Sequence, residues 1–376
     1  MLKVMSVFGT RPEAIKMAPV VAELQRRGPQ VHSVVCVTAQ HREMLDQVLG
    51  VFGIQPDHDL DLMRPNQSLP ELTSRVLLET TRVLREARPD VVLVQGDTTT
   101  AMAAALAAFY ERIPVGHVEA GLRTNDRYYP FPEEINRRLI GPIATFHFAP
   151  TERAMAALRA NGVPEDDLFL TGNTVVDALQ RITGSVQAPV MPYPAPGRRL
   201  VLVTAHRREN FGEPMARVFS AIRRLSAAFA DVEFVYPVHP NPNVAAAARE
   251  ALGATERVHL IPPLDYVAFT HLLAKCHLVL TDSGGVQEEA PALGKPALVL
   301  RNETERPEGV EAGVALLVGT DEERIVAEAS LLLSDGEAYR RMSQSRSLYG
   351  DGNAASRIVE ILIERVATVS QERDAA

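Results

Sequence analysis

The sequence predicts an α/β protein made of two parallel-sheet domains in tandem. Short β-branched runs alternate with amphipathic helical stretches along almost the whole chain, which is the pattern of repeated βαβ units. A proline-rich segment at residues 187–199 interrupts this alternation and reads as a linker. The length of 376 residues and the hydrophobic content of 46% are sufficient for two separate cores.

The predicted elements follow one another in a regular order. In the first half, strands are expected at residues 3–8, 32–38, 91–95, 114–118 and 145–148, and helices at 13–27, 42–49, 72–86 and 100–111. In the second half, strands are expected at residues 200–204, 232–237, 258–261, 278–282, 297–300 and 315–318. Two doubly wound domains in tandem usually hold a ligand in the cleft between them, at the carboxyl ends of their strands.

The end of the chain bears on the domain boundaries. Residues 354–369 form a helical stretch that is apolar on one side, so it has a face to pack against another element. We expect a first domain at residues 1–183, completed by 353–376, and a second domain at 184–352.

Composition excludes several classes of protein. The formal net charge of −8 shows no basic surplus, which argues against a nucleic-acid partner. No apolar run has the length of a membrane span, and residues 1–13 lack the layout of a signal peptide. Cys36 and Cys276 are expected to be buried free thiols. His117 and Glu119 could share a metal, but a lone pair is weak evidence. We expect a cytoplasmic protein without a membrane partner, a metal or a cofactor.

The most informative stretch is residues 277–296. An apolar run ends in Thr-Asp-Ser-Gly-Gly, and a helical pattern follows. Free N–H groups and the helix dipole make such a corner an anion site, and Gly284 and Gly285 let a phosphate approach the backbone closely. Glu289, one turn into the helix, suits the hydroxyl groups of a ribose. The alternative is an ordinary strand–helix turn capped by Ser283.

Other polar groups also follow predicted strands. Arg11 and Lys16 come after the first strand and can face an anion, although solvated charges on a capped helix would explain them too. Asp97 follows the strand at 91–95, where it could instead be a helix N-cap. Glu119 ends an apolar run, a costly position for an unpaired carboxylate. Glu133 begins a helix whose second turn carries two arginines.

Eleven blocks of the sequence resemble, in the same order, the non-hydrolysing UDP-N-acetylglucosamine 2-epimerases. The resemblance runs nearly end to end. In two places the chain departs from it: Tyr129 stands where relatives often have serine, and Asn66 where some have arginine. The blocks are FGTRPEAIKMAP (8–19), TAQHREMLDQVL (38–49), QGDTTT (95–100), GHVEAGLRT (116–124), FPEEINRRL (131–139), TGNTVVDAL (171–179), TAHRREN (204–210), YPVHPNPNV (236–244), TDSGGVQEEAPALGKP (281–296), ERPEGV (305–310) and YGDG (349–352).

The resemblance implies a fold and a set of site residues. It implies two Rossmann-like domains facing a central cleft, as in GT-B glycosyltransferases. The matching residues that would act on the sugar are Asp97, Glu119, Glu133 and His206. Those that would bind the substrate are Arg11, Lys16, Arg137, Phe269, Ser283, Gly284, Gly285, Glu289 and Arg306. Those that match the region of a second, activating UDP-GlcNAc are Gln40, Gln67, Arg207 and His239.

The implied activity is reversible conversion of UDP-GlcNAc to UDP-ManNAc, through loss of UDP to a 2-acetamidoglucal and its re-addition. The family also implies a homodimer and a supply of sugar for cell-surface polysaccharide. Four alternatives stay open: an epimerase of a modified UDP-N-acetylhexosamine, a GT-B glycosyltransferase, a hydrolysing epimerase that releases free ManNAc, and a nucleotide-sugar sensor that binds without turnover. The crowding of Asp97, Glu119 and Glu133 favours the epimerase, since inversion at C2 needs acid–base groups on both faces of the ring.

Overall fold

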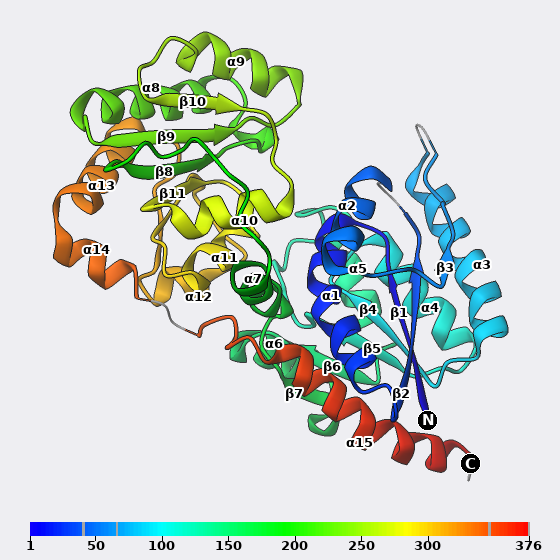
Figure 1. Ribbon diagram of the computed structural model, residues 1–376. Coiled ribbons are helices and arrows are strands. Elements are labelled where there is room, and N and C mark those ends of the chain that lie inside the picture. Colours follow the sequence, from blue (N-terminus) through cyan, green and yellow to red (C-terminus); the bar gives the residue numbers. More distant parts are fainter. Residues whose placement is uncertain (40–41, 65–66, 345–346, 375–376) are drawn as a thin grey trace. The chain divides into compact units, whose positions relative to one another are not determined.

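The computed structural model describes residues 1–39, 42–64, 67–344 and 347–374 (Figure 1). The chain divides into two compact units, residues 1–180 with 349–376 and residues 181–348. Each unit contains one sheet in which every pair of neighbouring strands is parallel. The predicted fold class, two parallel α/β domains, is therefore confirmed. No helix in the described residues is both long enough and apolar enough for a membrane span.

The first unit has a sheet in the order β3-β2-β1-β4-β5-β6-β7. Its strands are β1 (Leu2–Phe8), β2 (Val31–Val37), β3 (His58–Asp59), β4 (Val91–Gln95), β5 (Val115–Val118), β6 (Phe146–Ala149) and β7 (Leu168–Leu170). Its helices are α1 (Arg11–Arg26), α2 (Arg42–Phe52), α3 (Leu69–Ala87), α4 (Thr99–Tyr110), α5 (Glu133–Ile140), α6 (Glu152–Ala160), the short η1 (Glu165–Asp167), α7 (Thr174–Ser185), which runs on into the second unit, and α15 (Ala354–Asp374). The strand order reverses beside β1, so right-handed crossovers place helices on both faces.

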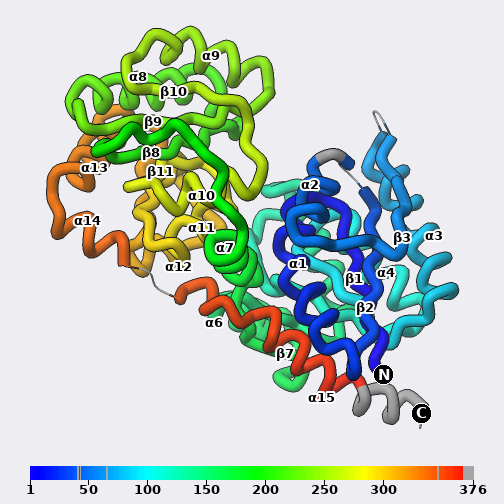
Figure 2. The backbone as a smooth tube through the Cα atoms, viewed as in Figure 1, coloured from blue at the N-terminus to red at the C-terminus, as the bar shows by residue number. Residues whose placement is uncertain are grey.

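The C-terminal helix belongs to the first unit. After residue 348 the chain returns to this unit, and α15 packs against α1, as the red and blue segments of Figure 2 show. Arg27 pairs with Glu360 at 2.8 Å, and Asp177 accepts hydrogen bonds from the N–H groups of Ala354 and Ala355. Those last two bonds satisfy N–H groups in the first turn of α15, which have no partner within the helix.

The second unit has a sheet in the order β10-β9-β8-β11-β12-β13. Its strands are β8 (Arg199–Thr204), β9 (Val232–Pro237), β10 (Val258–Ile261), β11 (Leu278–Thr281), β12 (Ala297–Val299) and β13 (Ala315–Leu317). Its helices are η2 (Arg208–Asn210), α8 (Glu213–Ala228), α9 (Pro242–Leu252), α10 (Tyr266–Lys275), α11 (Val286–Ala292), α12 (Pro307–Glu311), α13 (Glu322–Ser334) and α14 (Gly336–Met342).

Both faces of the second sheet are buried. Along β8, Val201 and Val203 pack into one apolar core, and Leu200 and Leu202 pack into another. Successive side chains of a strand point to opposite faces, so a strand covered on both sides must be apolar throughout. This is why the central strands read as continuous apolar runs in the sequence.

The predicted strands are present, and none of their ends differs from the prediction by more than one residue. The structure adds β3 and β7, which were not predicted. β3 has only two residues and β7 only three, and neither is a run of β-branched residues. Such short segments become strands because a neighbouring strand offers hydrogen bonds, which local sequence does not reveal.

Candidate active site

The first strand–helix turn of the first unit is held by a buried carboxylate. Thr10 caps α1, and the carboxylate of Glu13 accepts hydrogen bonds from the N–H groups of Gly9 and Thr10 and from the hydroxyl of Thr98. Burial raises the pKa of Glu13, and these hydrogen bonds oppose that change. A side chain at position 9 would place its Cβ 2.0 Å from Oγ1 of Thr38, so the turn requires glycine there.

Glu119 lies directly after β5 and is joined to α1 by an ion pair. Nζ of Lys16 is 2.7 Å from Oε1 of Glu119 and 2.5 Å from Oε2, and the amide of Gln95 also donates to this carboxylate. Glu119 has a φ of 63°, a left-handed conformation that is uncommon for residues other than glycine. Arg11, the first residue of α1, is half-buried. Lys16 and Glu119 therefore belong to one buried charge cluster.

Asp97 and Arg137 form a second ion pair. Gly96 and Asp97 follow β4, and Arg137 lies on α5. Nε and Nη2 of Arg137 are 2.8 and 2.7 Å from the same oxygen of Asp97, and the Asn136 side chain donates to the Asp97 carbonyl at 2.8 Å. Because β4 and β5 are adjacent, Asp97 and Glu119 both follow neighbouring strands at one edge of the sheet.

Glu133 differs from Asp97 and Glu119 in having no ion pair among the described residues. It is the first residue of α5, and its Oε2 is buried without a hydrogen-bond partner. Burial raises the pKa of Glu133, and the negative charge of Asp97 acts in the same direction. The Asp97–Glu133 pair thus combines an arginine-bound carboxylate with one whose pKa is raised, an arrangement suited to acid–base chemistry.

Glu134 explains the two arginines of α5. Its fully buried carboxylate accepts hydrogen bonds from the Thr124 N–H at 3.0 Å, from Arg137 at 3.2 Å and from Arg138 at 2.9 Å. Burial would raise the pKa of Glu134, but these hydrogen bonds and positive charges lower it overall. Glu134 therefore fixes Arg137, which in turn contacts Asp97.

In the second unit, the turn after β11 is open to a ligand. Gly284 and Gly285 have negative φ, so the glycines are not required by backbone conformation. A Cβ on Gly285 would meet no atom within 4 Å, whereas a Cβ on Gly284 would lie 3.0 Å from Nη1 of Arg306. Arg306 is itself paired with the buried Glu288 at 2.5 Å. The N–H of Ser283 donates to Oγ1 of Thr281 at 3.0 Å, which shapes the turn.

The next part of this edge carries Glu289 and Phe269. Glu289 is buried in the first turn of α11, and its charge raises the pKa of Tyr266, which burial already raises. Phe269, on α10, packs against the apolar core beside it. A buried carboxylate, an aromatic ring and two glycines thus share the carboxyl-end side of the second sheet.

His206 and Arg207 follow β8, the neighbour of β11. Their N–H groups both donate to one oxygen of Asp282 at 2.8 Å, and Nδ1 of His206 is 3.5 Å from its other oxygen. The rings of His206 and His239 stack, with centroids 5.3 Å apart. Asp282 therefore holds the segment that presents His206.

Comparisons with known proteins identify the family. A family model described as UDP-N-acetylglucosamine 2-epimerase matches residues 22–363. The chain belongs to the UDP-N-acetylglucosamine 2-epimerase family. The UDP-N-acetylglucosamine 2-epimerase of Bacillus subtilis (strain 168) is 55% identical over 363 residues, 96% of this chain and 95% of that protein. The Escherichia coli (strain K12) protein of the same name is 52% identical over 370 residues, 96% of this chain and 98% of that protein.

Solved structures agree with this membership. The UDP-GlcNAc 2-epimerase of Neisseria meningitidis bound to UDP-GlcNAc has a TM-score of 0.91 at 48% identity, covering 97% of this chain and 100% of that chain. The Methanocaldococcus jannaschii UDP-GlcNAc 2-epimerase in complex with UDP-GlcNAc and UDP has a TM-score of 0.80 at 34% identity. The match covers 96% of this chain and 99% of that chain. The resemblance to 2-epimerases and the GT-B-like architecture are thereby confirmed.

Among the residues predicted for an activator site of this 2-epimerase family member, Gln40 lies outside the described residues. Gln67 is in the first unit, where it bonds Met63, Arg75 and the N–H of Arg64. Arg207 and His239 are in the second unit, described above.

His117 and Glu119 do not share a metal site in the structure. Nε2 of His117 contacts the Gly96 carbonyl at 2.7 Å, while Glu119 binds Lys16. Burial lowers the pKa of His117 to about 3, so its ring is neutral at physiological pH. His117 therefore has a structural partner of its own.

Sequence reasoning missed four residues that hold the predicted ones in place. All four are polar residues that lie close in sequence to a predicted site residue, and all four side chains are buried. A buried polar side chain needs a hydrogen-bond partner, so this combination is the signal that would have found them. They are Gln95, Glu134, Asp282 and Glu288.

Proposed function

We propose that this protein interconverts UDP-GlcNAc and UDP-ManNAc by reversible epimerisation at C2, without net hydrolysis. The observation that carries the proposal is the pair of carboxylates Asp97 and Glu133, one bound by Arg137 and the other with a raised pKa. Relatives that share about half of the sequence over nearly the full chain carry the name of this activity.

The chemistry explains why two carboxylates are needed. The hydrogen on C2 is not adjacent to a carbonyl, so its direct removal would leave an unstabilised carbanion. If the C1–O bond breaks first, its electrons leave with UDP and C1 becomes oxocarbenium-like, which makes the C2 hydrogen acidic. Loss of that proton gives a 2-acetamidoglucal with a C1–C2 double bond. Protonation of C2 on the opposite face and return of UDP to C1 complete the inversion.

Asp97 and Glu133 suit these two proton transfers. We assign Asp97 as the base that accepts the C2 proton in one direction, oriented by Arg137. Glu133, whose pKa is raised by burial, supplies the proton to the opposite face of the ring. In the reverse direction the two carboxylates exchange roles. Glu119, bound by Lys16, positions the sugar.

The second unit supplies the proposed nucleotide site. Ser283, Gly284 and Gly285 form the diphosphate cradle, with open space at Gly285 where a phosphate can approach. Glu289 accepts hydrogen bonds from the ribose, and Phe269 and Arg306 contact the uracil. His206 contacts the diphosphate and stabilises the charge that develops on departing UDP. In the first unit, Arg11 and Lys16 are the proposed substrate-binding cations.

Assembly and regulation are the finer parts of the proposal. We propose a homodimer, supported by exposed apolar side chains on α3 and α4 of the first unit: Leu78, Phe109 and Tyr110 are 67%, 55% and 62% exposed. Activation by a second UDP-GlcNAc would use Gln40, Gln67, Arg207 and His239. The product would supply polysaccharide synthesis, and two buried free cysteines suit the cytoplasm.

The test is NMR spectroscopy of UDP-GlcNAc mixed with the protein in D₂O. We expect UDP-ManNAc carrying deuterium at C2, and scrambling of an ¹⁸O label from the bridging to the non-bridging positions of the β-phosphate. Product that keeps its C2 hydrogen, or a label that stays in place through many turnovers, would contradict the proposal. Free ManNAc would indicate a hydrolysing enzyme instead, and turnover only with an added acceptor would indicate a glycosyltransferase.

A modified sugar as the true substrate is tested by competition. UDP-GlcNAc and a UDP-diacetamido uronic acid are supplied together, and their kcat/KM values are compared. A larger kcat/KM for UDP-GlcNAc is expected, and the reverse order would reassign the substrate.

A further inference from the structure

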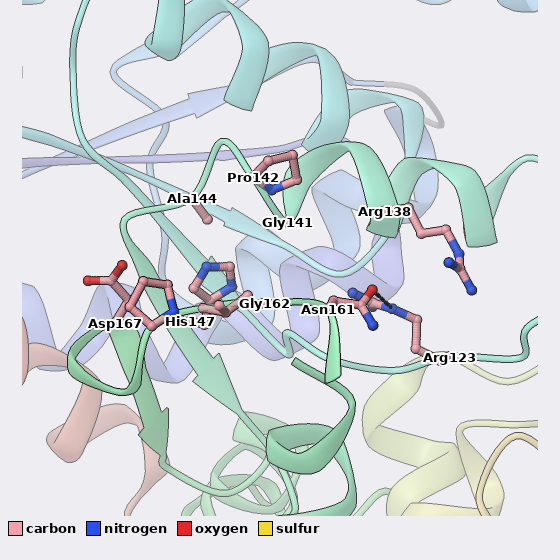
Figure 3. A pocket seen from close by; sticks show the side chains of 11 residues that line it. Arg123, Arg138, Gly141, Pro142, Ala144, His147, Asn161, Gly162 and Asp167 are labelled. Carbon is pink, nitrogen blue, oxygen red and sulfur yellow. Dashed lines mark hydrogen bonds between the residues drawn. The ribbon is translucent and has the colours of Figure 1, made fainter. Parts of the chain in front are cut away.

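One cavity in the first unit has no role in the proposed reaction. It has a volume of about 420 Å³ and is lined by the last turn of α5, the loop that follows it, β6, and the loop between α6 and β7 (Figure 3). None of the proposed catalytic or substrate-binding residues lines it.

One end of the cavity is positively charged. Arg123 makes hydrogen bonds only to neutral groups in the described part of the chain, donating to the Leu122 carbonyl at 2.7 Å and to Oδ1 of Asn161 at 3.4 Å. Burial lowers the pKa of Arg123. Arg138 also lines this end, where its Nη2 donates to Oδ1 of Asn125 at 3.2 Å. Glu134 pairs with Arg138, and its charge also raises the pKa of Arg123, against the effect of burial. Arg123 has no ion pair of its own among the described residues, so a bound anion would stabilise this half-buried guanidinium.

The other end offers hydrogen-bond acceptors. Nδ1 of His147 is buried and finds no hydrogen-bond partner among the residues that the structure describes, and the side chain is only 1% exposed. Burial lowers the pKa of His147 to about 4, so the ring is neutral and one ring nitrogen can accept a hydrogen bond. Asp167 adds a carboxylate at this end (Figure 3). Pro142 and Val163 contribute apolar groups to the lining of the cavity.

We propose that this cavity binds a hydroxylated organic anion of monosaccharide size, a sugar phosphate or a sugar acid. Arg123 and Arg138 bind the phosphate or carboxylate through charge-assisted hydrogen bonds. His147 and Asp167 accept hydrogen bonds from hydroxyl groups at the other end.

The cavity is connected to the proposed active site by a continuous chain of ion pairs. Arg138 pairs with Glu134 at 2.9 Å, Glu134 with Arg137 at 3.2 Å, and Arg137 with Asp97 at 2.7 Å. An anion that draws Arg138 toward the cavity weakens its hold on Glu134, which also holds Arg137. Occupancy of the cavity therefore changes the rate of epimerisation, a consequence that rests on the proposed function.

Binding is tested without reference to activity. Isothermal titration calorimetry of the full chain uses glucose 6-phosphate, gluconate, inorganic phosphate and glucose as probes. We expect saturable binding of one or both sugar anions, weaker binding of inorganic phosphate and none of glucose. Arg123→Gln should weaken binding about tenfold or more. Arg127→Gln, an exposed arginine of the same unit outside the cavity, should bind as the wild type does.

Three results would overturn the proposal: no saturable binding of either sugar anion, equal binding by Arg123→Gln, or inorganic phosphate binding as tightly as glucose 6-phosphate. The wild type provides a readout that needs no variant. The ¹⁵N shifts of the His147 ring must change on titration, and unchanged shifts would exclude the cavity even if Arg123→Gln does not fold.

The effect on turnover is measured separately. Saturating sugar anion should change the kcat of the wild type at least twofold and leave that of Arg123→Gln unaffected. Binding without a change in kcat would overturn the coupling alone. A protein that does not epimerise UDP-GlcNAc but binds the anion would contradict the proposed function and leave the binding site standing.

Discussion

Arg137 directs two nitrogens, Nε and Nη2, at a single oxygen of Asp97, at 2.8 and 2.7 Å. The other oxygen of Asp97 has no hydrogen bond among the described residues. Glu134 holds the same guanidinium through Nη1 at 3.2 Å. The arginine thus fixes the orientation of Asp97 while one carboxylate oxygen stays available for a proton.

Asp97→Asn is expected to lower kcat by about 10²- to 10⁴-fold, because an amide cannot accept the C2 proton. The thermal midpoint should change little, since the amide keeps a hydrogen-bond acceptor for Arg137. The assay is epimerisation followed by NMR, with Asp46→Asn, an exposed aspartate of α2, as the matched control. Wild-type turnover in Asp97→Asn would remove this residue from the mechanism.

Glu133→Gln should lower kcat without lowering the thermal stability of the protein. The folded-state pKa of Glu133 is raised, so its contribution to stability is complete below the unfolded pKa and is lost as pH rises through the folded pKa. Near neutral pH the variant should therefore melt at the same or a slightly higher temperature, by roughly 1–3 °C. Its kcat should fall by about 10²-fold or more.

The pH dependence gives a second check on Glu133. If it donates a proton, kcat of the wild type should decline as pH rises through the raised pKa of this group. This decline in kcat should be absent from the residual activity of Glu133→Gln. It should be present in Glu86→Gln, which changes an exposed glutamate of α3. If the pH dependence of kcat in Glu133→Gln is unchanged, the decline belongs to the titration of another group.

The Lys16–Glu119 pair should behave as a buried ion pair. Its side chains are 13% and 4% exposed, so Lys16→Met leaves a buried carboxylate unpaired and should lower the free energy of unfolding by about 3 kcal/mol. In the double variant Lys16→Met/Glu119→Gln the loss should be smaller than the sum of the two single losses. Urea unfolding measures all three. Additive losses would show that the two groups do not interact energetically.

The two glycines after β11 should respond differently to alanine. A Cβ at position 285 meets no protein atom, so Gly285→Ala should fold normally and weaken UDP binding about tenfold, if a phosphate occupies that space. Gly284→Ala also forces Arg306 to move, so it should weaken UDP binding and disturb the Arg306–Glu288 pair. Calorimetry with UDP decides: wild-type affinity in Gly285→Ala would exclude the diphosphate cradle.

Much of the site was visible in the sequence because polar residues at the ends of apolar strands are a local signal. Asp97 and Glu119 were predicted at such positions, and the structure places each after its strand. The support around them was less visible. Asp282 was read as part of a glycine turn, yet its carboxylate holds the N–H groups of His206 and Arg207, which are more than 70 residues away in sequence.

By itself the sequence determined the two parallel sheets, the family and the turns that carry the polar groups. These follow from side-chain periodicity, turn residues and ordered motifs, all of which act over a few residues. Only the tertiary structure decided which charge faces which. Lys16 meets Glu119 across 103 residues and Arg137 meets Asp97 across 40, because the strand order makes β1, β4 and β5 neighbours. Strand order depends on the packing of the whole sheet, so these pairings, and the unpaired Glu133 beside them, could not be read from local sequence.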